Sequence, residues 1–86
     1  MSIENFMKKR PYLLWYTKDY KHLSQEAALE AVLNYGDFDD VKKIIAIVGL
    51  KRAAEIFRKQ TLRKRINYSP KILNYFDLYF HRYARL

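Results

Sequence analysis

The chain has 86 residues, no cysteine and a net charge of +8. This length allows one modest hydrophobic core, to which eight tyrosines and five phenylalanines can contribute a large buried area. The absence of cysteine excludes disulfides, thiolate metal sites and cysteine nucleophiles, and it favours a reducing compartment, so we expect a cytoplasmic location. Neither a signal peptide nor a membrane span is expected, because the longest apolar run, residues 44–48, is far too short.

The beginning of the chain is marked by a proline and a cluster of aromatic residues. Residues 1–10 are expected to form either a short helix or an N-terminal arm, which Pro11 would interrupt. Residues 12–16 are densely apolar and predict a buried turn of helix, whereas residues 18–22 indicate a loop. No linker or repeat follows, so we expect residues 1–86 to form a single helical domain.

Two helices are predicted between residues 24 and 49. Ser24 is a good N-cap for a helix over 25–35, and Gly36 follows at the position where a left-handed residue ends a helix. The aspartates among residues 37–40 suit the positive end of a second helix, which Gly49 would end in the same way. The predicted buried faces are Ala28, Leu29, Val32 and Tyr35 in the first helix, and Val41, Ile44, Ile45 and Val48 in the second.

Two further helices follow. The first covers residues 50–61 and should bend or stop at Leu62, which falls on the charged side of this helix. The second is expected to begin at Ser69-Pro70, a strong helix start. The predicted buried residues are Leu50, Ala53, Ala54, Phe57 and Thr61 in the first of these helices, and Ile72, Leu73, Phe76, Tyr79, Phe80 and Tyr83 in the last. Because no segment alternates with a two-residue period, we expect an all-α fold, a compact bundle of four to five short helices with an aromatic core.

The sequence offers few residues for catalysis or metal binding. His22 and His81 have no histidine or cysteine at ligand spacing, so surface histidines are favoured over a zinc site. The aspartates among residues 37–40 could bind a hard cation, but helix capping explains them. The serines lack the glycine-flanked turn of a nucleophile, and two isolated glycines cannot form a phosphate-binding loop. We therefore expect no enzyme activity, no metal and no cofactor, with an active site completed by a partner as the alternative.

The basic segment, which we define as the eight lysines and arginines from residue 50 to residue 71, is the most informative feature. Glu55 is the only acidic residue in the same stretch of sequence, whereas residues 1–49 have no net charge. Dense cations on a rigid support suit phosphates or an acidic protein surface, whereas an ordinary solvent-facing helix mixes both signs. The candidate binding residues are Lys51, Arg52, Arg58, Lys59, Arg63, Lys64, Arg65 and Lys71.

Two other features leave alternatives open. The predicted helices around Gly49 match the apolar-turn pattern of a helix-turn-helix pair, but Glu55 stands where a recognition helix has an apolar core residue. Tyr75, Tyr79 and Tyr83 of the last helix are expected in the core, although they could equally line a partner interface, where tyrosine is enriched.

Three stretches carry a resemblance to a known family. They are Leu14-Trp15, residues 32–37 leading to Val48-Gly49, and residues 69–76. Over residues 13–80 the chain resembles a family of small, uncharacterised bacterial helical proteins, although Tyr75 stands where the family pattern often has phenylalanine. Members of that family often accompany AbiEii-type nucleotidyltransferase toxins, so the resemblance implies an antitoxin-like role. It implies no catalytic residue.

The sequence therefore predicts a binding protein. Our first hypothesis is an antitoxin-like protein that binds and restrains a partner protein, such as a nucleotidyltransferase-type toxin, through the basic segment. The alternative is a regulator that binds DNA or RNA with a helix-turn-helix-like pair around Gly49. A membrane is not an expected partner, and the oligomeric state, including a homodimer, stays open.

Overall fold

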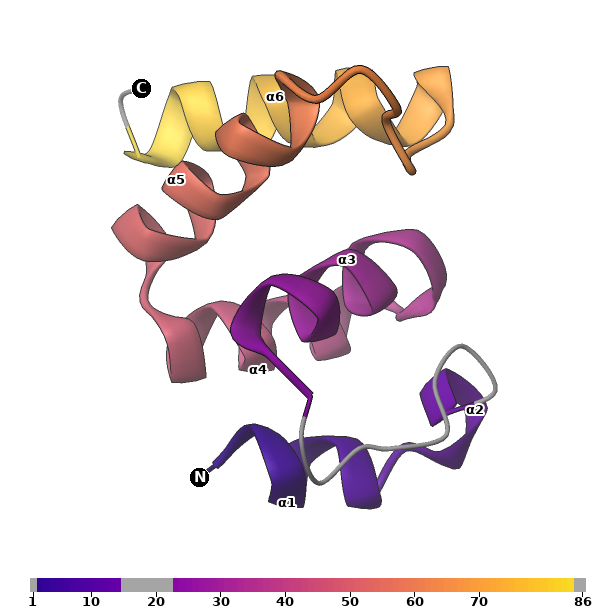
Figure 1. Cartoon of the computed structure of the whole chain (residues 1–86). Helices are drawn as coiled ribbons and strands as arrows, with labels where there is room; N and C mark the ends of the chain where they lie inside the picture. The colour runs from indigo at the N-terminus through magenta and orange to yellow at the C-terminus, as the bar shows by residue number, and fades with distance from the viewer. Residues whose placement is uncertain (1, 15–22, 85–86) are drawn as a thin grey trace.

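The computed structural model describes residues 2–14 and 23–84, which form six α-helices and no strand (Figure 1). This confirms the all-α class, with one helix more than the four to five expected. The predicted loop at 18–22 and the end of the apolar cluster at 12–16 lie outside the described residues. The helices are α1 (Ile3–Lys8), α2 (Pro11–Leu14), α3 (Gln25–Tyr35), α4 (Phe38–Val48), α5 (Leu50–Thr61) and α6 (Pro70–Ala84).

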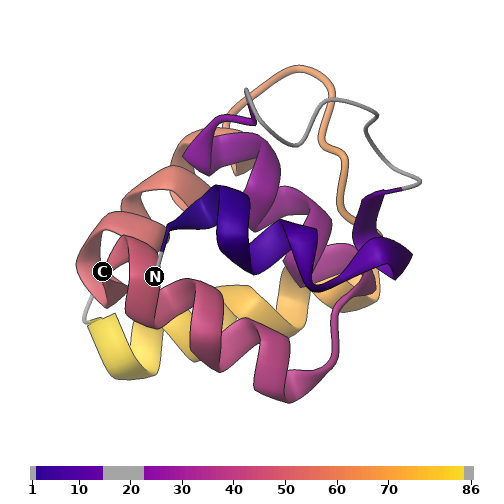
Figure 2. The ribbon, with the colours of Figure 1, turned by 90° about the horizontal axis from the view of Figure 1, so that it is seen from below.

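The N-terminal residues form a packed helix, which decides between the two alternatives for this region. The Ser2 hydroxyl accepts a hydrogen bond from the amide of Asn5 and so caps α1, and Phe6 and Met7 are fully buried. Pro11 does interrupt α1, but it also begins α2, because the first position of a helix needs no amide hydrogen. Figure 2 shows α1 crossing α3 and α4, both of which it contacts.

Helix α3 lies at the centre of the described structure and packs against each of the other five helices. In Figure 1 it lies between α6 on one side and α1 and α2 on the other. Ser24 caps it as predicted, accepting a hydrogen bond from the amide of Ala27. The prediction that Tyr35 is buried is wrong, because this last residue of α3 lies where the chain leaves the core towards α4. The buried residues are Ala28, Leu29, Glu30, Ala31, Val32 and Leu33.

The connection between α3 and α4 corrects one detail of the prediction. Gly36 has φ −78° and ψ 162°, so it is extended and not left-handed. A side chain is excluded there for a different reason: a Cβ atom would lie 2.8 Å from the carbonyl oxygen of Val32. The chain then enters α4 through a capping box between Asp37 and Asp40.

Gly49 alone separates α4 from α5. Its φ of 97° lies in the region that favours glycine, as its predicted role at a helix end requires. The bounds of α5 and its end at Leu62 agree with the prediction. Its buried face differs, because Gln60 and Ile56 are buried, whereas Thr61 is only partly buried.

Helix α6 closes the aromatic part of the core. Ser69 and Pro70 begin it as predicted, with the serine hydroxyl accepting from the amide of Ile72. The ring of Phe57 lies 5.3 Å from that of Phe80, within a cluster that also includes Tyr68 and Phe76. None of the helices in residues 2–14 and 23–84 has the length and apolar character that a membrane span needs.

A buried ion pair joins the start of the chain to α4. Arg10 and Asp40 are 8% and 3% exposed, and the Arg10 Nε lies 2.6 Å from the Asp40 Oδ1. The hydroxyl of Tyr12 donates a hydrogen bond to the same carboxylate. The partial desolvation of the Tyr12 hydroxyl, followed by this hydrogen bond, raises the pKa of Tyr12 to about 12. Burial alone would raise the pKa of Asp40, but the hydrogen bonds from Tyr12, Arg10 and Asp37 outweigh it, so the pKa is lowered.

Asp40→Asn should destabilise the fold by about 3 kcal/mol, because it leaves the buried Arg10 guanidinium without a compensating charge. Asp39→Asn is the matched control, since Asp39 forms only a solvent-exposed pair with Lys43 and should change stability by less than about 0.5 kcal/mol. Urea unfolding measures both free energies, and equal effects would contradict the role given to Asp40.

The stability gained from Asp40 should also depend on pH. Its pKa in the folded protein lies below the ordinary value of 3.8, so its contribution is complete above that value and is lost as the pH falls towards the folded pKa. We expect the difference in unfolding free energy between wild type and Asp40→Asn to be constant above about pH 5 and to shrink below about pH 4. A difference that shrinks as the pH rises from 5 to 8 would show the opposite sign.

Candidate functional site

The eight cations of the basic segment are all exposed, and the structure divides them into two groups. Lys51 and Arg52 lie in the first turn of α5, roughly 16 Å along the helix axis from its C-terminal end. The other six lie in the last turn of α5, on the connection over residues 62–69 and in the first turn of α6. We call these six the basic corner: Arg58, Lys59, Arg63, Lys64, Arg65 and Lys71.

Among the described residues, Arg52 is the one cation of the basic segment that forms an ion pair. Arg52 pairs with Glu26 of α3 at 3.3 Å and approaches Glu55 at 3.9 Å. Within residues 2–14 and 23–84, no acidic side chain forms an ion pair with any cation of the basic corner. Carboxylates lie in the same hollows as two of these cations, Glu26 and Glu30 with Arg63 and Asp77 with Arg58, and the positive charge that they leave unbalanced is available to an anionic partner.

A buried glutamine holds the start of the connection in place. Gln60 is 4% exposed, and its Nε2 donates to the backbone carbonyl of Glu26 at 3.0 Å. Its Oε1 accepts a hydrogen bond from the hydroxyl of Tyr68, at the other end of the connection. This pair was not predicted from the sequence, although Gln60 follows Phe57 by three residues and so falls on the buried face of α5.

Two asparagines hold the end of the connection. Asn67 donates from Nδ2 to the carboxylate of Glu30 at 3.0 Å, and its backbone carbonyl accepts from the Asn34 side chain at 3.1 Å. Within the described residues, no buried side-chain nitrogen or oxygen lacks a partner. Three cations of the basic corner, Arg63, Lys64 and Arg65, are therefore displayed on a connection that is fixed at both ends to α3, and the other three lie on the helix turns that flank it.

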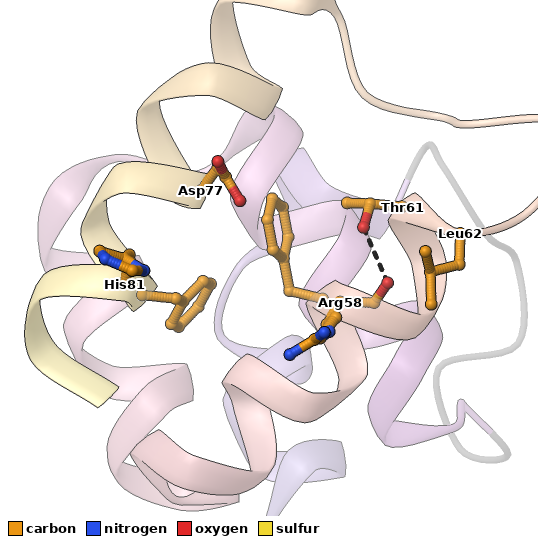
Figure 3. A pocket seen from close by; sticks show the side chains of 7 residues that line it. Arg58, Thr61, Leu62, Asp77 and His81 are labelled. Carbon is orange, nitrogen blue, oxygen red and sulfur yellow. Dashed lines mark hydrogen bonds between the residues drawn. The ribbon is translucent and has the colours of Figure 1, made fainter. Parts of the chain in front are cut away.

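A hollow of about 310 Å³ opens beside the basic corner, between α5 and α6. Figure 3 shows Arg58, Thr61 and Leu62 on the α5 side and Asp77 and His81 on the α6 side. The buried rings of Phe57 and Phe80 also line it, and the Thr61 hydroxyl donates to the Arg58 carbonyl at 2.7 Å. The hollow can take an apolar group, while the Arg58 guanidinium can pair with a carboxylate or phosphate at its rim.

A second surface lies on the other flank of α6. Tyr75, Leu78 and Tyr83 are 52%, 61% and 55% exposed, so the expectation that Tyr75 and Tyr83 are core residues is wrong. They lie beside Phe38 of α4, which is 52% exposed and which the sequence analysis missed because it belongs to another helix. We call this surface the aromatic face; its residues are Phe38, Tyr75, Leu78, Tyr79 and Tyr83. Tyr79 is partly buried, and this burial, followed by its two tyrosine neighbours, raises its pKa.

The remaining sequence candidates contribute little to either surface. The one-residue turn at Gly49 is shorter than the three to four residues of a DNA-binding helix-turn-helix. Within the two described ranges, no group of three or more histidine, aspartate or glutamate side chains could hold a metal ion. His81 is exposed beside the hollow, and His22 lies outside the described residues.

No protein-family model, no curated protein and no solved structure matches the chain. The geometry and charge of the two surfaces are therefore the observations that bear on function.

Tyr68→Phe should loosen the basic corner. It removes the hydroxyl that donates to buried Gln60, and we expect a loss of about 1–2 kcal/mol and faster amide hydrogen exchange over residues 62–69. Tyr75→Phe, the control, removes a hydroxyl from an exposed tyrosine of α6 and should change stability by less than about 0.5 kcal/mol. If exchange over residues 62–69 is the same in both variants, Tyr68 does not hold the connection.

Proposed function

We propose that this chain is a non-catalytic binding protein that docks its basic corner onto an acidic surface of a partner protein and restrains it, as an antitoxin does. One observation carries the proposal: six exposed cations, none of which forms an ion pair with an acidic side chain among the described residues, lie on a connection fixed at both ends and on the helix turns that flank it. A fixed array of charges matches a complementary surface with little loss of conformational entropy on binding.

A nucleotidyltransferase-type toxin, the partner implied by the family resemblance, would offer a suitable surface. Phosphoryl-transferring enzymes hold divalent cations with carboxylates, and such a cleft attracts cations before the metal and substrate arrive. Arg58 and Arg63 are the cations of the basic corner that we expect to enter such a cleft. We place this interaction in the cytoplasm, because small secreted domains often depend on disulfides and this chain has no cysteine.

Nucleic-acid binding is the second candidate, because Arg63, Lys64 and Arg65 form an uninterrupted run of exposed cations. Such a run can contact successive phosphates without reading bases. Two features favour a protein partner over base recognition: the short turn at Gly49, and the ion pairs that occupy Arg52 on the exposed side of α5.

Replacing Arg63, Lys64 and Arg65 together by glutamine should weaken the complex with the protein encoded by the adjacent gene by about tenfold or more. Isothermal titration calorimetry measures this affinity. The matched control replaces Lys8, Lys9 and Lys43 by glutamine, which removes the same charge. Lys8 and Lys9 lie at the end of α1 and Lys43 lies in α4, all outside the basic corner, and Figure 1 shows α1 and the connection at opposite ends of the molecule. The control should therefore change the affinity less than about threefold.

Three outcomes would contradict the proposal. They are no complex with the wild-type chain, an equal loss of affinity in both triple variants, and a complex that does not weaken with rising salt. A salt-dependent complex with a DNA or RNA oligonucleotide, without any complex with the protein, would instead support the second candidate.

A further inference from the structure

We infer that the aromatic face is a second contact surface, which takes an acidic amphipathic segment of the partner protein. Apolar side chains of that segment enter the hollow between Phe38 and α6, and its carboxylates pair with Lys42 and Arg82. The inference rests on the proposed function only in that the occupant belongs to a partner protein.

The aromatic face combines exposed apolar side chains with a hollow. Three of the largest exposed apolar side chains, Phe38, Leu78 and Tyr83, lie around one hollow of about 280 Å³. An apolar cavity of about 150 Å³ accommodates benzene, so this hollow has room for at least one large side chain of a partner. Grouped exposed apolar residues of this kind mark interaction sites, whereas scattered ones do not.

The shape of the surface favours a segment over a single small molecule. Tyr75, Tyr79 and Tyr83 follow one another along α6, with ring centroids 6.5 Å and 4.8 Å apart. They form a ridge parallel to the helix axis, and Phe38 stands on the other side of the hollow. An apolar groove along a helix suits the apolar side of an amphipathic helix.

The charge of the surface decides the chemistry of the occupant. The Lys42 Nζ lies 5.1 Å from the ring centroid of Phe38, and the Arg82 Cζ lies 5.6 Å from that of Tyr83. Neither cation forms an ion pair within residues 2–14 and 23–84. The acidic residues nearest to Lys42 in sequence have other partners: Asp40 pairs with Arg10, Asp39 pairs with Lys43 at 3.1 Å, and Asp37 caps α4. Asp77, the acidic residue nearest to Arg82 in sequence, lines the hollow on the other flank of α6. The charge left over is positive, so an acidic occupant is complementary.

A second copy of the chain fits this surface less well. A two-fold interface brings the same surface of each copy together, so Lys42 and Arg82 would meet Lys42 and Arg82. Juxtaposed like charges oppose association, and the aromatic face has no carboxylate free to neutralise them.

Two designed peptides of about 16 residues test the inference with the full chain. Both carry leucine and phenylalanine with helical spacing, and the remaining positions are glutamate in one and lysine in the other. Fluorescence anisotropy should show that the wild-type chain binds the glutamate peptide at least about tenfold more tightly than the lysine peptide. Leu78→Gln with Tyr83→Gln should weaken that binding about tenfold, because both side chains belong to the aromatic face.

A second pair of variants tests the charges separately. Lys42→Gln with Arg82→Gln leaves the apolar surface unchanged and should reduce the preference for the glutamate peptide to less than about threefold. All four substituted residues are exposed, so thermal unfolding should show that both double variants retain the fold.

The outcomes distinguish this inference from the proposed function. The inference is overturned if the glutamate peptide fails to bind, if the lysine peptide binds equally well, or if replacing Arg63, Lys64 and Arg65 weakens binding more than replacing Leu78 and Tyr83. It is also overturned if the wild-type chain forms a dimer that the Leu78 and Tyr83 variant abolishes. If the glutamate peptide binds as expected but the adjacent gene product does not, the proposed function fails while the aromatic face keeps its assignment.

Discussion

The burial of α3 is the constraint on which the rest of the structure depends. This helix packs against each of the other five described helices, so few of its side chains can face water. Glu30 is nevertheless 9% exposed within it, and a buried carboxylate needs hydrogen bonds to replace those of water. Asn67 supplies one of them from the connection between α5 and α6. The polar requirement of the central helix therefore fixes the segment that displays the basic corner.

The partners of the other carboxylates influence where the net charge appears on the surface. Several carboxylates of the neutral half of the chain have partners within the fold: Asp40 neutralises Arg10 in the interior, Asp37 caps α4, and Glu26 pairs with Arg52 at the surface. Few acidic groups remain to balance the cations at and beyond the end of α5, so most of the excess charge appears in the basic corner, and a smaller part appears at Lys42 and Arg82 of the second surface. A partner with a concentrated negative charge is complementary to such a surface, whereas a weakly charged partner gains little from it.

Helix α6 connects the two candidate surfaces because its buried residues separate its two flanks. Phe76 and Phe80 pack into the core against Phe57. The flank towards the end of α5 lines the hollow beside Arg58, and the flank towards α4 carries the aromatic face. A single partner could contact both flanks by extending across this helix. The two surfaces differ in chemistry, since one offers mainly cations and the other mainly rings, so they can be altered independently.

The sequence by itself determined the all-α class and most helix bounds, because caps and periodicity act over a few residues. Ser24 and Ser69 accept hydrogen bonds from amides three residues ahead, and such signals do not depend on the rest of the fold. Only the tertiary structure decided which polar residues are buried, since Arg10 meets a partner thirty residues away through the packing of α1 and α4. It also decided the exposure of Tyr83, because a helical stripe wider than the available core leaves its outer residues on the surface.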